Sequence, residues 1–277
     1  MRVFWIEGTV ALLSVSLCSA QALAKGVTLL DNYVGGYDTW SGSGSAIGSH
    51  DGATLYNGQV IGDPSVFGIT SANIQRTGAG GDTLQVVINT NYAGHGGADG
   101  TGYGALFLTP GVNVWRPSGS AANGYATDQY KANEWTFAAS MPTVPTQLAG
   151  TGGLYAVASG NVVLSNVYGS QTTYPYVGNP GWFFRQGQAV QFTTSTAQVA
   201  SENWSIDPSA HTVTFQIVDN GLLGNDFAMS WAMTCGNDVI QGQVSGVPEP
   251  STWAMMTLGF AGLAAAARRR RSGRKAA

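Results

Sequence analysis

The chain has 277 residues, enough for one large or two small domains. Only 10 % of these residues are charged, against roughly 25 % in a typical soluble domain, while the 39 glycines are about twice the usual share. Glycine weakens helices and charged residues usually cover them, so this composition argues against a long-helix protein. The aromatic content of 10 % argues against simple disorder, and a β-rich protein remains.

The first 24 residues have the layout of a secretory signal peptide. Arg2 precedes the apolar run 10–17, and the small-residue pattern Ala22-Leu23-Ala24 predicts cleavage after residue 24. The alternative is a lipoprotein signal at Cys18, although the leucine before it is larger than such signals use. We expect the mature chain to begin at Lys25.

Runs of apolar or alternating residues, separated by turn residues, predict strands along the body. The clearest pair is a hairpin of 67–74 and 83–90 around the glycine-rich turn 78–82, because apolar and polar residues alternate in its second strand. Further predicted strands are, in chain order, 27–30, 105–108, 135–139, 154–158, 162–164, 189–193, 211–218, 227–233 and 239–244.

The glycine-rich stretches 41–50 and 91–104 are expected to be loops. About ten strands at this spacing, with no amphipathic helix between them, indicate an antiparallel protein. We therefore predict an all-β chain whose residues 25–246 form a single β-sandwich or jelly-roll domain, with a signal helix before it and a short transmembrane helix after it.

The body between residues 25 and 247 holds five basic and thirteen acidic residues, which gives a net charge of about −8. Nucleic-acid binding needs Lys and Arg to neutralise phosphates, so we exclude nucleic acid as a partner. A cationic partner, a divalent ion or simple solubility fits this charge better. Cys235 lies in an apolar run and is expected to be a buried structural thiol.

Calcium is the one cofactor for which the sequence offers residues. Asp219, Asn220 and Asp226 flank a predicted loop, and oxygen ligands brought together by loop ends suit Ca²⁺. The same residues are also ordinary turn formers, so both interpretations stay open.

Three tryptophans in loop-like segments, Trp40, Trp115 and Trp182, are candidates for glycan contact, because aromatic faces can stack on sugar rings. They could instead close loops over the core. A glycosidase would need two carboxylates across a cleft. Glu134 and Glu202 are the body's two glutamates, but nothing in the sequence pairs them. We assign no catalytic residue and keep a polysaccharide hydrolase or lyase as the alternative function.

Residues 247–277 have three parts in a fixed order. Pro248, Glu249 and Pro250 come first, and the apolar stretch 252–267 follows. The third part is an arginine run, Arg268, Arg269, Arg270 and Arg271. A helix over the apolar stretch would rise roughly 25 Å, just short of a ~30 Å hydrocarbon core. The positive-inside rule keeps the arginines cytoplasmic and places the body on the far side.

This tail resembles the PEP-CTERM sorting signal of Gram-negative bacteria. The resemblance implies export through the secretion translocon, transient anchoring in the inner membrane and recognition by an exosortase, a membrane cysteine protease/transpeptidase. The protein then passes to the cell surface or the extracellular matrix. A plain C-terminal membrane anchor is the alternative.

Proteins with this signal typically accompany exopolysaccharide production, so the resemblance implies a biofilm-matrix role with exopolysaccharide as a partner. The segment Phe227–Ile240 is similar to the endings of uncharacterised PEP-CTERM proteins and implies no activity. We expect a secreted cell-surface or matrix protein without a catalytic role.

Overall fold

The all-β antiparallel class is confirmed by the computed structural model. It describes residues 26–33, 35, 37–40, 43–46, 55–56, 60–61, 63–78, 80–125, 128, 131, 134–165, 185–193, 197–247 and 259–262. The predicted signal peptide, 1–24, lies outside these ranges.

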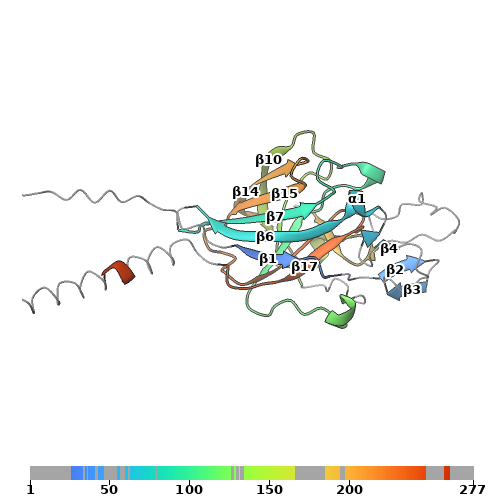
Figure 1. The fold of residues 1–277 in the computed structure, drawn as a ribbon, viewed down its shortest axis with the longest axis horizontal. Coiled ribbons are helices and arrows are strands. Elements are labelled where there is room, and N and C mark those ends of the chain that lie inside the picture. Colours follow the sequence, from blue (N-terminus) through green and yellow to red (C-terminus); the bar gives the residue numbers. More distant parts are fainter. Residues whose placement is uncertain are drawn as a thin grey trace, which may run out of the picture.

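Ten strands form one antiparallel sheet (Figure 1). In spatial order they are β1 (Val27–Leu30), β6 (Ile69–Thr77), β7 (Thr83–Thr90), β15 (Thr212–Val218), β14 (Gln198–Asp207), β10 (Ala149–Ala156), β9 (Phe137–Ala139), β8 (Leu106–Pro110), β16 (Phe227–Ala232) and β17 (Val239–Val244). The sheet curls until its edge strands approach each other, and Leu29 of β1 packs beside Gly242 of β17. The two layers expected of a sandwich are thus two halves of one sheet that almost closes on itself.

The remaining elements are short. They are β2 (Tyr37–Trp40), β3 (Ser43–Ala46) and β12 (Arg185–Gln186) in one small sheet, β4 (Leu55–Tyr56) with β5 (Val60–Ile61), β11 (Val162–Leu164) with β13 (Ala189–Phe192), the helix α1 (Pro64–Phe67), and the 3₁₀ turns η1 (Ala98–Gly100), η2 (Ala121–Asn123) and η3 (Ser159–Asn161). Strand β3 corrects the expectation that 41–50 is a loop. Glycine and serine have low strand propensity, so only the backbone pairing with β2 makes this segment a strand.

The predicted hairpin is confirmed as β6 and β7, joined at the glycine-rich turn 78–82. In β7 the inward residues Leu84, Val86 and Ile88 are fully buried. They face the interior together with alternate residues of β15 and β16, which are Val213, Phe215, Ile217, Phe227, Met229 and Trp231. The alternation in the sequence therefore located the core correctly.

Strand β14 has ten residues and was missed by the sequence analysis. Its inward side chains are Glu202, Trp204 and Ile206, while the intervening residues are exposed. A glutamate among the inward positions hides the alternation, because a charged residue is normally counted on the solvent side.

The two ends of the body lie at the same end of the sheet as the β6–β7 turn (Figure 1). Gly26 lies against the backbone of β6, at the end of β1 nearest that turn. Residues 219–226, which join β15 to β16, meet the turn through the Asn220 N–H, which donates to the Asp82 carbonyl at 3.1 Å. Val247 in turn bonds to this connection, here called the 219–226 loop. The sheet thus brings both ends of the body to one pole, here called the tail end.

Candidate functional site

In the structure, the described part of the body runs to Val247, the residue before the Pro-Glu-Pro part of the predicted sorting signal. Val247 is fully buried in the main hydrophobic core, and its N–H donates to the Asn225 carbonyl at 3.0 Å. The Gly246 N–H donates to the Asp226 carboxylate at 3.1 Å. Pro248 is therefore the next residue after one that is fixed in the core. The signal residues Pro248, Glu249, Pro250, Arg268, Arg269, Arg270 and Arg271 lie outside the described residues.

A buried ion pair fixes the loop that holds Val247. The Arg76 guanidinium of β6 donates to both carboxylate oxygens of Asp219, at 2.5 and 3.2 Å, and also to the Gly224 carbonyl. The Leu223 N–H donates to the same carboxylate at 2.9 Å. Each buried charge is thus compensated, as burial of a charge requires. The pair ties the 219–226 loop to the hairpin.

The calcium candidates have other partners in the structure. Asp219 is neutralised by arginine, and Asp226 accepts the Gly246 N–H. Asn220 adopts a left-handed backbone with φ 49°, as a turn residue does. Within the described ranges, no group of three or more His, Cys, Asp or Glu is placed to hold a metal ion. A calcium site stays a prediction, but the carboxylate of Asp219 already pairs with Arg76.

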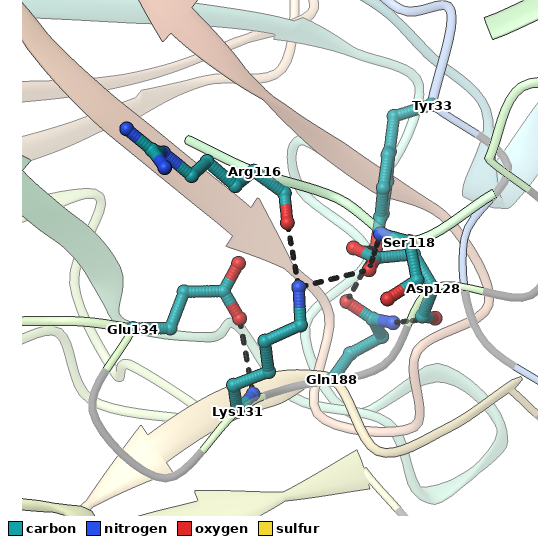
Figure 2. Close-up of polar contacts among 7 residues, drawn as sticks. All are labelled: Tyr33, Arg116, Ser118, Asp128, Lys131, Glu134 and Gln188. Atoms are coloured by element: carbon teal, nitrogen blue, oxygen red, sulfur yellow. Dashed lines mark hydrogen bonds and ion pairs between the residues drawn. The ribbon is translucent and has the colours of Figure 1, made fainter. Parts of the chain in front are cut away.

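A second polar cluster involves residues 111–136, which join β8 to β9 (Figure 2). Its centre is Asp128, whose carboxylate is fully buried and accepts hydrogen bonds from the Tyr33 hydroxyl at 2.8 Å and from the Ser118 N–H. Lys131 Nζ lies 3.8 Å from the same carboxylate. The Gln188 side chain donates to the Asp128 carbonyl at 3.3 Å. The cluster joins three segments that are distant in sequence, and it was not predicted from the sequence.

Glu134 belongs to this cluster and has an unusual acidity. The pKa of Glu134 is raised to about 7, chiefly by burial and also by the negative charge of Asp128. A hydrogen bond from the Lys131 N–H to Oε2 at 3.1 Å and the charge of Lys131 work against this rise. Burial and the neighbouring Asp128 also raise the pKa of Tyr33 well above its ordinary value. The sequence had singled out Glu134 but not its acidic neighbour. With a pKa of about 7, the Glu134 carboxyl titrates near neutral pH.

Trp115 packs beside this cluster in a group of three aromatic rings. Its ring lies 5.1 Å from that of Tyr125 and 6.0 Å from that of Tyr33, edge to face in both cases. Trp115 and Tyr125 are half-buried, and the Trp115 Nε1 has no hydrogen-bond partner among the described residues. Tyr125 adopts a left-handed backbone with φ 57°, which is strained for an aromatic residue. Of the other two candidates, Trp40 ends β2 with its side chain outside the description, and Trp182 lies outside the described residues.

Glu202 is the most unusual buried group of the body. It is 1 % exposed, and neither carboxylate oxygen has a hydrogen-bond partner among the described residues. Burial raises the pKa of Glu202 to about 8. The neighbouring inward side chain, Trp204, also has an unpartnered Nε1. Gly152 of β10 leaves the space that Glu202 fills, since a Cβ there would lie 2.4 Å from Oε2. The Glu-x-Trp-x-Ile spacing of residues 202–206 was the pattern in the sequence that could have predicted an inward-facing glutamate on a strand.

Cys235 is buried, as its apolar surroundings predicted. The Thr101 hydroxyl donates to its Sγ at 2.9 Å. In the part of the tail that is described, residues 259–262 are helical. No helix in the described ranges is both long and apolar enough to cross a membrane.

The comparisons with known proteins concern the tail. Residues 246–271 match the family model of the PEP-CTERM protein-sorting motif. The chain carries this sorting motif. The resemblance seen in the sequence is thereby confirmed, and the PEP-CTERM motif implies export to the cell envelope or surface, with recognition by an exosortase during processing. No curated protein and no solved structure matches the chain.

Proposed function

We propose that this PEP-CTERM protein is a cell-surface or extracellular-matrix protein without a catalytic role that associates with exopolysaccharide. The observation that carries the proposal is the sorting motif over residues 246–271. Sorting by an exosortase places the folded body outside the cytoplasm, where surface glycans are the abundant partners. The body itself is acidic, with a net charge of about −8, which favours solubility in the hydrated space outside the cell.

The apolar stretch 252–267 would hold the chain in the inner membrane until it is processed. As a helix it rises roughly 25 Å, which a bilayer accommodates by local thinning. The arginine run 268–271 would remain on the cytoplasmic side by the positive-inside rule. Anchoring is then transient, because the exosortase removes the tail.

The burial and the hydrogen bonds of the carboxyl groups support a role without catalysis. Asp128 and Asp219 each accept several internal hydrogen bonds, and both are buried. Glu202 faces the apolar interior of the sheet. Because these carboxyl groups are enclosed within the fold, they are poor candidates for general acid or base catalysis on an external polysaccharide.

Glycan contact is supported by the group around Trp115. The half-buried rings of Trp115 and Tyr125 offer aromatic surface. Arg116 and Lys131 are exposed next to them, and they are two of only five basic residues of the body. The Lys131 Nζ donates to the Arg116 backbone carbonyl, which holds the lysine amine beside the chain at residue 116 (Figure 2). An aromatic surface with adjacent cations suits a carboxylated sugar.

The test is binding of the processed protein, recovered from the cell surface, to exopolysaccharide of the producing organism. A Trp115→Leu variant removes the central ring, and Phe137→Leu, a half-buried aromatic of β9 outside the cluster, is the matched control. An aromatic contact contributes about 0.5–1.5 kcal/mol, so Trp115→Leu should weaken binding roughly twofold to tenfold. Absence of binding by the wild type would refute the exopolysaccharide association.

The alternative function is that of a polysaccharide-degrading enzyme. One observation favours it: Glu134 has a pKa of about 7 and lies close enough to Asp128 to feel its charge. A carboxyl of this kind can act as a general acid near neutral pH. Shortened polysaccharide chains with the wild type, and intact chains with Glu134→Gln, would establish this alternative.

A further inference from the structure

We infer that the tail end of the body lies against the lipid headgroups of the membrane until the sorting signal is removed. This inference rests on the proposed transient anchoring by residues 252–267. It concerns a surface that we call the tail-end face, which consists of the exposed side chains Val112, Val199 and Leu222 at the tail end of the sheet. The partner is a lipid surface.

The tether between the core and the apolar stretch is short. Val247 is fixed in the core, and only four residues, 248–251, separate it from the apolar stretch. Even fully extended, the five steps from residue 247 to residue 252 span at most about 18 Å. The headgroup layer of one leaflet takes up about 5–7 Å of that distance. Val247 therefore cannot lie more than about 12 Å from the headgroup surface, a gap that surrounding side chains fill.

Hydrogen bonds and an ion pair fix the tail end relative to Val247. The 219–226 loop is held to β6 by the Arg76–Asp219 pair, and its Asp226 carbonyl accepts the Gly111 N–H at 2.8 Å. The start of β14, which carries Val199, lies beside this loop, because Ser201 pairs with Val218 at the end of β15. A short tether on a rigid end leaves the body little freedom to turn another side to the membrane.

The tail-end face exposes apolar side chains. Val112, Val199 and Leu222 are 65 %, 44 % and 46 % exposed. The charged groups beside them make internal contacts: Asp219 is buried with Arg76, and Asp226 accepts a backbone N–H. Val144 and Leu148, at 57 % and 56 %, are exposed at the opposite pole. The two poles thus expose apolar side chains to a similar extent. The short tether at Val247 is what brings the tail end, and not the opposite pole, to the lipid.

The experiment uses the full chain with its tail, purified from cells that lack exosortase. It is reconstituted in phosphatidylethanolamine–phosphatidylglycerol vesicles that carry a headgroup nitroxide. A fluorophore is attached at Leu222→Cys or at the matched control Leu148→Cys, while the native Cys235 is buried. The two sites lie at opposite ends of strands such as β14, whose ten residues span about 33 Å. We expect the nitroxide to quench the fluorophore at 222 at least threefold more strongly than at 148.

A spacer variant tests the tether itself. A 16-residue Gly/Ser insertion between Val247 and Pro248 adds a root-mean-square reach of about 20–24 Å. It should lower quenching at 222 to the level at 148 while vesicle association stays unchanged. If the chain associates with vesicles but quenching at 222 is no stronger than at 148, the contact of the tail end with lipid is overturned and the anchoring is not. Quenching that appears only when exosortase is added would overturn it in favour of docking on the protease. Failure of the unmodified chain to associate with vesicles would refute the anchoring and the inference together.

Discussion

Glu202 should make the stability of the body depend on pH. In the folded chain its carboxyl lies in the apolar interior and its pKa is about 8, whereas an unfolded glutamate titrates near 4.5. The folded state therefore keeps a proton that the unfolded state loses as the pH rises. The contribution of this group is fully present below about pH 4.5 and is lost progressively up to about pH 8. A Glu202→Gln variant keeps the shape of the side chain but does not titrate.

The size of the effect follows from the two pKa values. A difference of about 3.5 units at about 1.4 kcal/mol per unit gives about 5 kcal/mol lost by the wild type and not by the variant. For a domain of 150–250 residues, 1 kcal/mol shifts the Tm by about 2–4 °C. The wild-type Tm should therefore fall by about 10–20 °C relative to that of Glu202→Gln between pH 4.5 and 8.5.

Thermal unfolding of both proteins, followed by circular dichroism at half-unit pH steps, measures this difference. If Glu202→Gln does not fold, Glu202→Met serves as a second variant without a titrating group. Parallel Tm curves for the wild type and the variant would show that the carboxyl is not held protonated in the interior. The account of Glu202 would then be wrong.

Three further predictions, each with its own substitutions, test other parts of the structure. Glu134→Gln should remove a smaller pH dependence that ends near pH 7, measured in the same way, because the pKa of Glu134 is raised to about 7. Arg76→Met leaves a buried carboxylate uncompensated and should cost about 3–5 kcal/mol in urea unfolding, much of which Asp219→Leu should restore in the double variant. Gly104→Ala puts a Cβ 1.9 Å from a backbone oxygen and should cost about 1–3 kcal/mol. Gly160→Ala, with open space around it, should change stability by less than about 0.5 kcal/mol.

Much of the fold could be predicted from alternation alone. Strands β1, β7, β11 and β17 have the predicted bounds, because apolar residues face one side and turn residues end each run. Alternation does not show how strands join into sheets. Whether two layers are separate sheets or one curled sheet depends on pairings such as β10 with β14, between residues about fifty positions apart. Strand β14 was missed because a glutamate occupies an inward position.

The candidate site was harder to predict than the fold, since it depends on contacts between distant segments. Asp128 meets Tyr33 and Gln188 across 95 and 60 positions of sequence. A buried carboxylate held by a tyrosine and a backbone N–H has no local pattern. Trp115 was singled out by its residue type, and the structure places it in an aromatic group rather than alone. By contrast, the sorting motif is local in sequence and could be identified from its residues.

The contacts of Val247 also limit where processing can cut the chain. Removal of this residue would expose a core position, at a cost of about 1.5–3 kcal/mol for a buried valine, and would break its hydrogen bond to Asn225. A protease at the membrane acts on chain that is accessible, and Val247 is fully buried. We therefore expect the mature protein to end at or beyond Val247, with the core intact after release. Mass spectrometry of the C-terminal peptide of the mature protein measures this directly, and a terminus before residue 247 would show that the end of the body opens before it is cut.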